Sequence, residues 1–397
     1  MNTLFKSFIY FFRGFSLIFF FLILSLSSKT QSRLTDNNWQ QLFAESYYSS
    51  YKGFHSLRDH WLNLSMSTNV TDMEALSNGL DAILAIYETT DSIDYLEDAI
   101  TLVKNNISKA QQIDLIPGNK LRFNDSYKGW IDRGKDTSTS YYHTEVVLSE
   151  IYFYQYVARL LKDINNDRKV KRIDKIKQFY TSTLSFIEKN IWDKWVNRGI
   201  RLKNNPYSYL LLGRTHMASH WAYIASELYF LTKNEKRKKD YLAFVNLYNN
   251  DLENNFSKYD KYILWNQTWD SITSGPGIIQ DVSHANLVIS YIVEAYDLGL
   301  WKDFDAIQRI INTIKDKLWD SQDCFFKDNI DGTMFQAGKS HSSVGSFQAD
   351  GFIKLTRYDK SLFSIYEKFI SCSKYLTAWY QYGQLFSNLA LSEKLLR

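Results

Sequence analysis

The chain has 397 residues, of which 3 are proline and 16 are glycine. So few turn-forming residues argue against collagen-like, low-complexity and all-β proteins. Hydrophobic residues make up 45% and charged residues 23%, which is a globular rather than a disordered composition. Three of the positive charges lie within residues 1–31, so the formal charge of +4 falls to +1 for the remainder. This charge does not predict a nucleic-acid partner.

The first 31 residues are typical of an export signal. Lys6 and Arg13 are followed by an unbroken apolar run over residues 15–26, and then by the small residues Ser27 and Ser28. The run is shorter than the roughly 20 residues that a membrane span requires. We predict a signal peptide over residues 1–31 and a secreted or periplasmic chain over 32–397, with an uncleaved membrane anchor as the alternative.

From residue 37 onward the hydrophobic pattern predicts helices of two kinds. Some segments have apolar residues at steps of three and four, as at Ile173, Ile176 and Tyr180, and are expected to keep one wet face. Others are apolar nearly all round and are expected to be enclosed by neighbours. Enclosed helices are predicted to begin near Asp72, Tyr142, Thr215, Asp281 and Ser346. Amphipathic helices are predicted over residues 92–112, 170–191, 235–255, 303–318 and 360–372.

The two kinds of helix alternate, and the enclosed helices recur every 65 to 73 residues. A first helix over residues 38–54 and a last helix over 376–395 lack partners, so pairing them would close a ring. A repeated helical hairpin indicates a solenoid or a closed toroid, and this repeat is too long for common solenoids. The sequence therefore predicts a single all-α domain, an (α/α)6–7 toroid.

Long connections lead from each amphipathic helix to the next enclosed helix. They cover residues 114–140, 196–213, 257–280 and 319–345, whereas the opposite connections are short. Long loops in a compact domain are usually functional. All of these loops are expected at one rim of the ring, where the enclosed helices begin, so we expect the functional site there.

Histidines gather at this predicted rim. Five of the 7 lie at or just before enclosed helices, namely His143, His216, His220, His284 and His341. Tyr141, Tyr142 and His143 begin one such helix and can carry out acid–base chemistry, with Glu145 either one turn inside the ring or a capping residue.

His216 and His220 lie one helical turn apart and could hold a metal ion. The glutamate that a zinc protease needs after the first histidine is missing, so we predict no metal and a proton-transfer or substrate-binding role. Arg214 is a natural clamp for a carboxylate. His284 and Asn286 are polar groups in an otherwise apolar helix, and such groups are paired or functional.

Aromatic loop residues suggest sugar binding. Trp130, Trp265 and Trp269 suit stacking on a sugar, although core packing is equally common for such rings. Gln348 lies in the last rim loop. Two segments, residues 128–134 and 193–199, are interpreted as small turns that carry an aromatic residue and an arginine. Cys324 and Cys372 are the only cysteines, and the sequence alone does not decide whether they pair.

Together these features resemble the (α/α)-toroid carbohydrate-active enzymes. The Tyr-Tyr-His segment 141–143, the two histidines of 216–220 and the Ser-His-Ala-Asn segment 283–286 are most similar to uronate-cleaving polysaccharide lyases, such as the alginate and glucuronan lyases of polysaccharide lyase family 38. The resemblance implies β-elimination without a cofactor. It implies that Asn286 and His284, with Arg214 or Glu145, neutralise the carboxylate of the sugar. It implies a base at His220 or His216 and an acid at Tyr141 or Tyr142, or one of these tyrosines as both acid and base.

Three further functions stay open. A glycoside hydrolase needs two carboxyl groups flanking the cleaved bond, and the candidates are Asp136, Glu145, Asp270, Asp281 and Asp350. Histidine and tyrosine outnumber carboxylates at the rim, which favours the lyase. The second open function is a uronate epimerase, and the third is a non-catalytic glycan-binding protein. In each case we expect a polysaccharide partner, no nucleic acid, no membrane contact after signal cleavage, and a monomer or weak oligomer.

Overall fold

The computed structural model describes residues 38–49, 55–70, 72–115, 123–130, 140–211, 213–269, 277–335, 344–372 and 379–396, with the backbone only at 140–148 and 379–382. The predicted signal peptide lies outside these residues. Across the described ranges, no helix is both long and apolar enough to cross a membrane.

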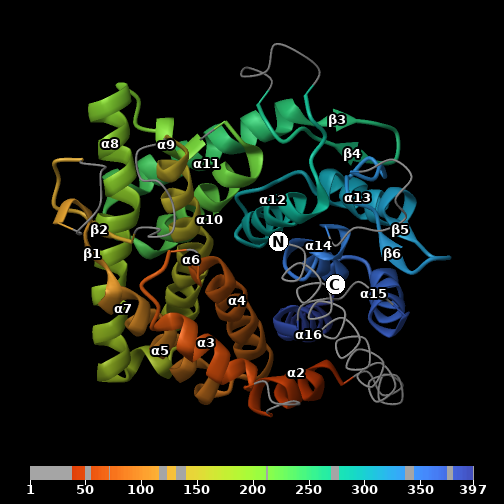
Figure 1. Ribbon diagram of the computed structural model, residues 1–397, viewed down its shortest axis with the longest axis horizontal. Coiled ribbons are helices and arrows are strands. Elements are labelled where there is room, and N and C mark those ends of the chain that lie inside the picture. The colour runs from red at the N-terminus through yellow and green to blue at the C-terminus, as the bar shows by residue number, and fades with distance from the viewer. Residues whose placement is uncertain are drawn as a thin grey trace, which may run out of the picture.

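The described helices form a closed ring of helical hairpins (Figure 1). The inner positions are occupied by α4 (Asp72–Thr90), α6 (Ser140–Asn166), α10 (Thr215–Leu231), α12 (Val282–Asp297), α14 (Gly351–Lys354) with its 3-10 continuation η7 (Leu355–Arg357), and α16 (Trp379–Lys394). Each inner helix packs against the next one along the chain, and α16 packs against α4. This closure confirms the predicted all-α toroid.

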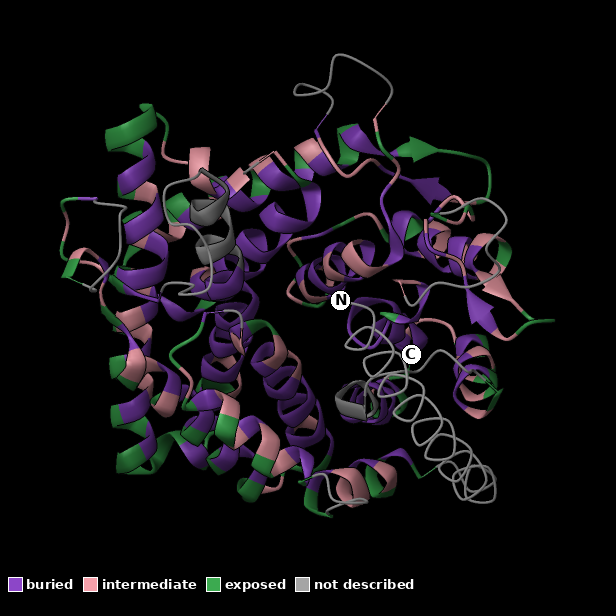
Figure 2. Cartoon of the chain, viewed as in Figure 1, coloured by how far each residue is buried: buried purple, intermediate pink, exposed green. Residues whose placement is uncertain are grey.

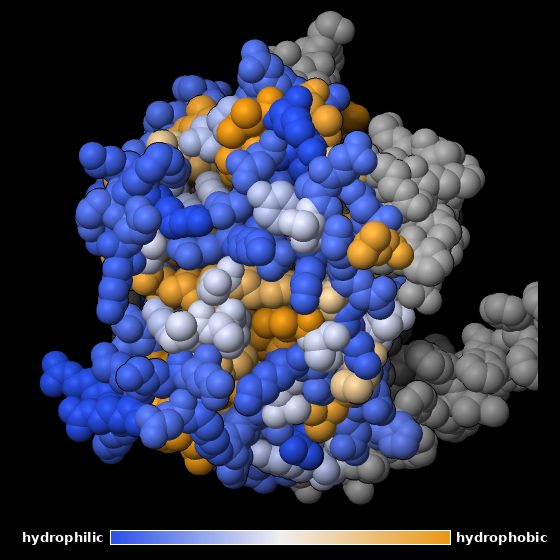
Figure 3. Space-filling model, turned by 90° about the vertical axis from the view of Figure 1, so that its left-hand side faces the viewer, coloured by the Kyte–Doolittle hydropathy of each residue, from blue (hydrophilic) through white to orange (hydrophobic). Residues whose placement is uncertain are grey.

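The outer layer consists of the amphipathic helices. These are α5 (Ile93–Lys109), α7 (Asp174–Phe186), α11 (Glu235–Asn255), α13 (Phe304–Thr313) and α15 (Ser361–Cys372), with α2 (Trp39–Tyr48) packed on α16. In Figure 2 the inner helices are buried on nearly all sides, whereas the outer helices alternate buried and exposed residues. Figure 3 views the molecule from the side of α7 and shows a largely hydrophilic surface with smaller apolar areas. The two hydrophobic patterns in the sequence therefore correspond to the two layers.

The N-terminal hairpin differs from the prediction of one helix over residues 38–54. Helix α2 ends at Tyr48, and a separate helix α3 (Leu57–Ser65) begins after Ser56, whose hydroxyl accepts a hydrogen bond from the backbone N–H of Asp59. Trp61 of α3 is fully buried against α4. A methyl group at Gly79 would lie 2.5 Å from the Trp61 ring, so this contact requires the glycine.

A second correction concerns the small turn predicted over residues 193–199 and the long connection predicted over 196–213. A π-helical stretch η4 (Ile187–Asp193) continues into α8 (Lys194–Lys203), and α9 (Ser208–Leu211) follows. The helix continues because its residues reach a buried acid on α6. The Lys194 ammonium lies 2.7 Å from both oxygens of Glu150, and the Trp195 indole N–H donates to Glu150 at 3.0 Å.

The connections from outer to inner helices contain short antiparallel hairpins that the sequence did not predict. They pair β1 (Gln111–Gln112) with β2 (Lys128–Gly129), β3 (Ser257–Lys258) with β4 (Ile263–Leu264), and β5 (Trp319–Asp320) with β6 (Phe325–Phe326). The remaining short helical segments are η2 (Ile113–Leu115), η3 (Val170–Arg172), η5 (Ile314–Leu318) and η6 (Val344–Ser346).

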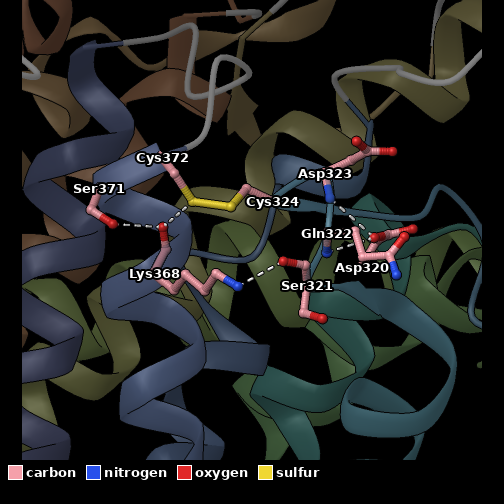
Figure 4. The surroundings of a disulfide bond; sticks show 8 residues. All are labelled: Asp320, Ser321, Gln322, Asp323, Cys324, Lys368, Ser371 and Cys372. Atoms are coloured by element: carbon pink, nitrogen blue, oxygen red, sulfur yellow. Dashed lines mark hydrogen bonds between the residues drawn. A yellow bond between two sulfur atoms is a disulfide. The ribbon is translucent and has the colours of Figure 1, made fainter.

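The two cysteines form a disulfide. Cys324, in the turn between β5 and β6, is bonded to Cys372 at the end of α15, and their Cα atoms lie 6.0 Å apart (Figure 4). The Lys368 ammonium donates a hydrogen bond to the carbonyl oxygen of Ser321 at 2.6 Å, beside the disulfide. The last rim connection is therefore covalently tied to the outer layer, and the pairing that the sequence left open is settled.

Candidate functional site

A pocket of about 390 Å³ opens at the rim where the inner helices begin. Its walls come from the first turns of α4 and α12, from α6 and α16, and from the segment that precedes α14. It is lined by Glu74, Ala75, Asn78, Tyr152, Ser283, His284, Asn286, Leu287, Phe347, Ala349 and Gln384. The pocket therefore lies at the rim where the site was expected.

Asp281 orients His284 at the start of α12. Asp281 caps the helix, since its Oδ1 accepts the backbone N–H of His284 at 3.1 Å and the hydroxyl of Ser283 at 2.6 Å. Its Oδ2 lies 2.6 Å from Nδ1 of His284. Burial acts to raise the pKa of Asp281, but the hydrogen bond and charge of His284 outweigh it, and the pKa falls to about 2.

The ionised Asp281 carboxylate can only accept hydrogen bonds, so the proton of a neutral His284 resides on Nδ1. The other ring nitrogen, Nε2, then keeps its lone pair. The His284 side chain is 38% exposed and lines the pocket. A carboxylate-oriented imidazole of this kind can take a proton from a bound water or hydroxyl group.

His216 and His220 lie behind the pocket rather than in it. They are 3% and 1% exposed, and their rings contact two pocket residues: His216 lies 4.1 Å from His284 and His220 lies 4.2 Å from Tyr152, between ring centroids. Burial lowers the pKa of His216 well below its ordinary value and that of His220 to about 3. Both rings are therefore neutral, and neither occupies the position of the catalytic base expected from the sequence.

A buried ionic cluster fills the ring below the pocket. The Lys354 ammonium contacts Asp350 and lies 3.1 Å from Asp81, which also pairs with Arg159 at 2.7 Å. Asp350 further accepts hydrogen bonds from the hydroxyls of Tyr156 and Ser290. Asp350, a hydrolase candidate from the sequence, is 3% exposed and fully engaged, so it acts as a structural acid.

The three tryptophans expected to stack on sugars belong to the core. Trp130, Trp265 and Trp269 are 2%, 1% and 7% exposed. Their ring neighbours are other core aromatics: Tyr154 and Phe186 for the first, Phe256 for the second and Tyr248 for the third. The expectation of sugar stacking by these rings is wrong, because the rings are buried against other core residues and no face is open to a ligand.

Two further predicted binding residues lie away from the pocket. Gln348 is fully buried and donates to the carbonyl oxygen of Gly345 at 2.9 Å, while its oxygen accepts from the hydroxyl of Tyr366 at 3.0 Å. Arg214 is exposed at the start of α10 and does not line the pocket. Neither is placed to contact a ligand there.

Other candidates fall on parts that the structure does not describe. The side chains of Tyr141, Tyr142, His143 and Glu145 belong to the first turns of α6, of which only the backbone is described. Asp136, Asp270 and His341 also lie outside the described residues. Their roles stay predictions.

Two of the residues expected from the sequence, His284 and Asn286, line the pocket. Glu74, Tyr152 and Gln384 also line it, and the sequence analysis did not identify them. Glu74 is the third residue of α4, and His284 is the third residue of α12, so the two occupy the same position in their helices. Comparing the starts of the inner helices with one another would have found it. Tyr152 is surrounded by acids, because the charges of Glu74, Asp281 and Asp350 add to burial in raising its pKa.

The described residues contain no group of three or more His, Cys, Asp or Glu side chains arranged to hold a metal ion.

Comparisons with known proteins give one structural likeness. No protein-family model and no curated protein matches this chain. Among solved structures, the chain is similar to an inactive variant of an α-1,6-mannanase, GH76A of Salegentibacter sp. HEL1_6, in complex with α-1,6-mannotetrose. The match has a TM-score of 0.48 and 11% identity, and covers 89% of this chain and 99% of the other.

The matched enzyme is a glycoside hydrolase, whereas the sequence predicted a polysaccharide lyase acting on alginate or another uronate polymer, and that prediction is not retained. The geometry disagrees with the lyase on its own account. Asn286 and His284 line the pocket, but Arg214 lies outside it, and the expected bases His216 and His220 are enclosed behind it, so no expected base faces the cavity among the described side chains. What the structure establishes is a helical toroid with a polar pocket at the rim where its inner helices begin.

Proposed function

We propose that this protein is a glycoside hydrolase whose substrate enters the pocket at the rim. One observation carries the proposal: the same pocket holds the carboxyl group of Glu74, the oriented imidazole of His284, several carboxamides and the aromatic ring of Phe347. Carboxamides and an aromatic ring suit a sugar, which offers hydroxyl groups and an apolar C–H face. An acid and a base in the same cavity suit cleavage of the bond between two sugars.

Glycoside hydrolysis requires a proton donor for the leaving oxygen and a base that activates water. Two carboxyl groups usually fill these roles, and here an imidazole takes the place of the second one. We assign the first role to Glu74 and the second to His284. As the glycosidic C–O bond breaks, Glu74 gives its proton to the leaving oxygen. Water attacks the anomeric carbon and gives a proton to Nε2 of His284. Exchange with solvent then restores both groups.

Asp281 serves this reaction as a positioning residue. Its hydrogen bond to Nδ1 fixes the orientation of the His284 ring, and its negative charge stabilises the imidazolium that forms when water is activated. The neutral His216 ring lies 4.1 Å from the same imidazole, between ring centroids, and adds no competing charge. This arrangement keeps His284 directed at the pocket between turnovers.

A glycan panel tests the proposal. We expect the purified chain to release new reducing ends from at least one member of a panel containing α-1,6-mannan, other α- and β-linked neutral glycans, and polyuronates. Glu74→Gln should lower kcat at least about 100-fold, which is the usual contribution of a general acid. Glu235→Gln is the matched control, because Glu235 occupies the first turn of α11 in the outer layer.

Two results would contradict the proposal. The first is the absence of new reducing ends from every glycan of the panel. The second is cleavage that Glu74→Gln and Glu235→Gln support equally well. Binding of a glycan without cleavage would instead indicate a non-catalytic glycan-binding protein.

A further inference from the structure

We infer that Asn78, Asn286, Gln384 and the ring of Phe347 form the sugar-binding wall of the pocket, and that this wall selects an uncharged, hydroxyl-bearing sugar. The side chains come from α4, α12, α16 and the segment before α14, so they surround the pocket. The wall thus defines the substrate class of the site proposed above. Only the identity of the ligand as a glycan rests on the proposed function.

The amide of Asn286 has a fixed orientation. Its Oδ1 accepts the backbone N–H of Phe352 at 3.0 Å. A backbone N–H requires an acceptor, so the amide cannot turn round without losing this hydrogen bond. The Nδ2 group makes no hydrogen bond to any described residue. Asn286 therefore offers N–H donors to the pocket that it lines.

Gln384 is fixed in the opposite sense. Its Nε2 donates to Oδ2 of Asp81 at 2.8 Å, inside the buried ionic cluster. A carboxylate accepts hydrogen bonds only, so this contact determines which end of the amide faces the acid. The side-chain oxygen Oε1 of Gln384 makes no hydrogen bond to a described residue and remains as an acceptor.

The two amides are complementary to a sugar hydroxyl, which can accept one hydrogen bond and donate another. A hydroxyl group can accept from Asn286, and the same or a neighbouring hydroxyl can donate to Gln384. Asn78, half-buried in the first turns of α4, makes no hydrogen bond to described residues and supplies both a donor and an acceptor. Phe347 is 37% exposed and can cover the C–H face of the ring.

The charges around this wall favour a neutral ligand. The low pKa of Asp281 keeps the carboxylate that holds His284 ionised, next to the pocket. The described lining contains neither lysine nor arginine. A uronate, sulfate or phosphate group would therefore meet like charge without a cation to neutralise it, which costs binding free energy.

Asn286→Asp tests the wall, because it keeps the acceptor for the Phe352 N–H and removes the free donor. The matched control is Asn190→Asp. Asn190 lies in η4, its Oδ1 accepts the backbone N–H of Lys128 at 2.9 Å, and it is 6% exposed, against 7% for Asn286. Affinity is measured by calorimetry with neutral and uronate oligosaccharides, in a Glu74→Gln background so that no ligand is consumed.

We expect neutral oligosaccharides to bind and uronate oligosaccharides to bind at least about tenfold more weakly. Asn286→Asp should weaken binding of the neutral ligand by about tenfold or more, which corresponds to the loss of one hydrogen bond to a buried partner. Asn190→Asp should leave the affinity unchanged. Cleavage by the chain with Glu74 intact is measured separately.

The outcomes separate the two proposals. If neutral ligands bind as expected but are never cleaved, the hydrolase proposal fails and the sugar-binding wall stands. Equal affinity of the Asn286→Asp and Asn190→Asp variants for the neutral ligand would overturn the wall. Preference for the uronate ligand, or no binding of any neutral oligosaccharide, would overturn it as well.

Discussion

At the scale of single residues, the three described histidines around the pocket show how burial divides one residue type into different roles. His284 is partly exposed and hydrogen-bonded to Asp281, whereas His216 and His220 are enclosed. Nδ1 of His216 and Nε2 of His220 have no hydrogen-bond partner among the described residues. The enclosed pair therefore supports the walls of the pocket, and the oriented histidine faces its interior.

The buried state of His220 predicts a loss of stability in acid. Its pKa is 6.5 when unperturbed and about 3 in the folded chain, because burial disfavours the charged form. The unfolded state therefore binds the extra proton first. This contribution to the free energy of unfolding is fully present above pH 6.5 and is lost as the pH falls toward 3, by up to about 1.4 kcal/mol per pH unit.

Urea denaturation between about pH 7 and pH 5 checks this. His220→Gln, which retains a polar partner for Gln155, should flatten the acid side of the stability profile. Profiles that run parallel for the wild type and His220→Gln would show that His220 does not carry this dependence.

At the scale of elements, the approach of α14 to α12 fixes one wall of the pocket. A methyl group built at Gly351 would lie 2.0 Å from the carbonyl oxygen of Asn286 and 2.4 Å from the backbone nitrogen of Ser290. Both of these atoms are backbone and cannot turn aside. Only glycine allows the two helices to come this close, and the same contact brings the Phe352 N–H to Asn286.

Gly351→Ala should therefore separate α14 from α12. We expect it to lower the free energy of unfolding by about 1–3 kcal/mol, which is typical of overpacking, and to weaken ligand binding because Asn286 loses its anchor. Thermal and chemical denaturation measure the first effect and calorimetry the second. Unchanged stability and unchanged affinity together would show that this close approach is not needed.

Hydrophobic periodicity predicted most elements because the two layers bury different fractions of each helix. The outer helix over 235–255 and the start of the inner helix near Thr215 agree with α11 and α10. The prediction failed where a long-range contact decides the local structure. Helix α8 continues because Lys194 and Trp195 reach Glu150, more than 40 residues earlier in the chain.

Prediction of the site was limited by the same cause. Asn286 was found because a polar group in an apolar helix is conspicuous, and the same reasoning applied to Gln384 would have found it. Trp265 and Trp269 were misplaced because the sequence does not show whether an aromatic residue in a loop turns inward. Nothing local distinguishes the enclosed His220 from the oriented His284, since the difference comes from neighbouring helices.

At the scale of the whole molecule, charged side chains cross the centre of the ring. Lys162 of α6 contacts Glu294 of α12 and lies 3.0 Å from Glu227 of α10. Burial raises the pKa of Glu227 to about 8, so this acid stays protonated while Glu294 is ionised. Three inner helices are thereby joined by one ion pair and one neutral acid.

This arrangement predicts weaker folding at alkaline pH. The folded pKa of Glu227 is raised above its unperturbed value of 4.5, so its stabilising contribution is full below 4.5 and is lost as the pH rises through about 8. The neutral variant Glu227→Gln should lose less stability than the wild type between about pH 6 and pH 9 in urea denaturation. Equal losses would show that another group controls the alkaline response.

The central claim is that the rim pocket adds water across a glycosidic bond. It is tested most directly by letting the chain act on a neutral glycan in water enriched in oxygen-18, and by mass spectrometry of the products after short incubation. Hydrolysis predicts one labelled oxygen at each new reducing end, with label lost from Glu74→Gln reactions. Cleavage products without label would contradict the account, since no water would then have entered the bond.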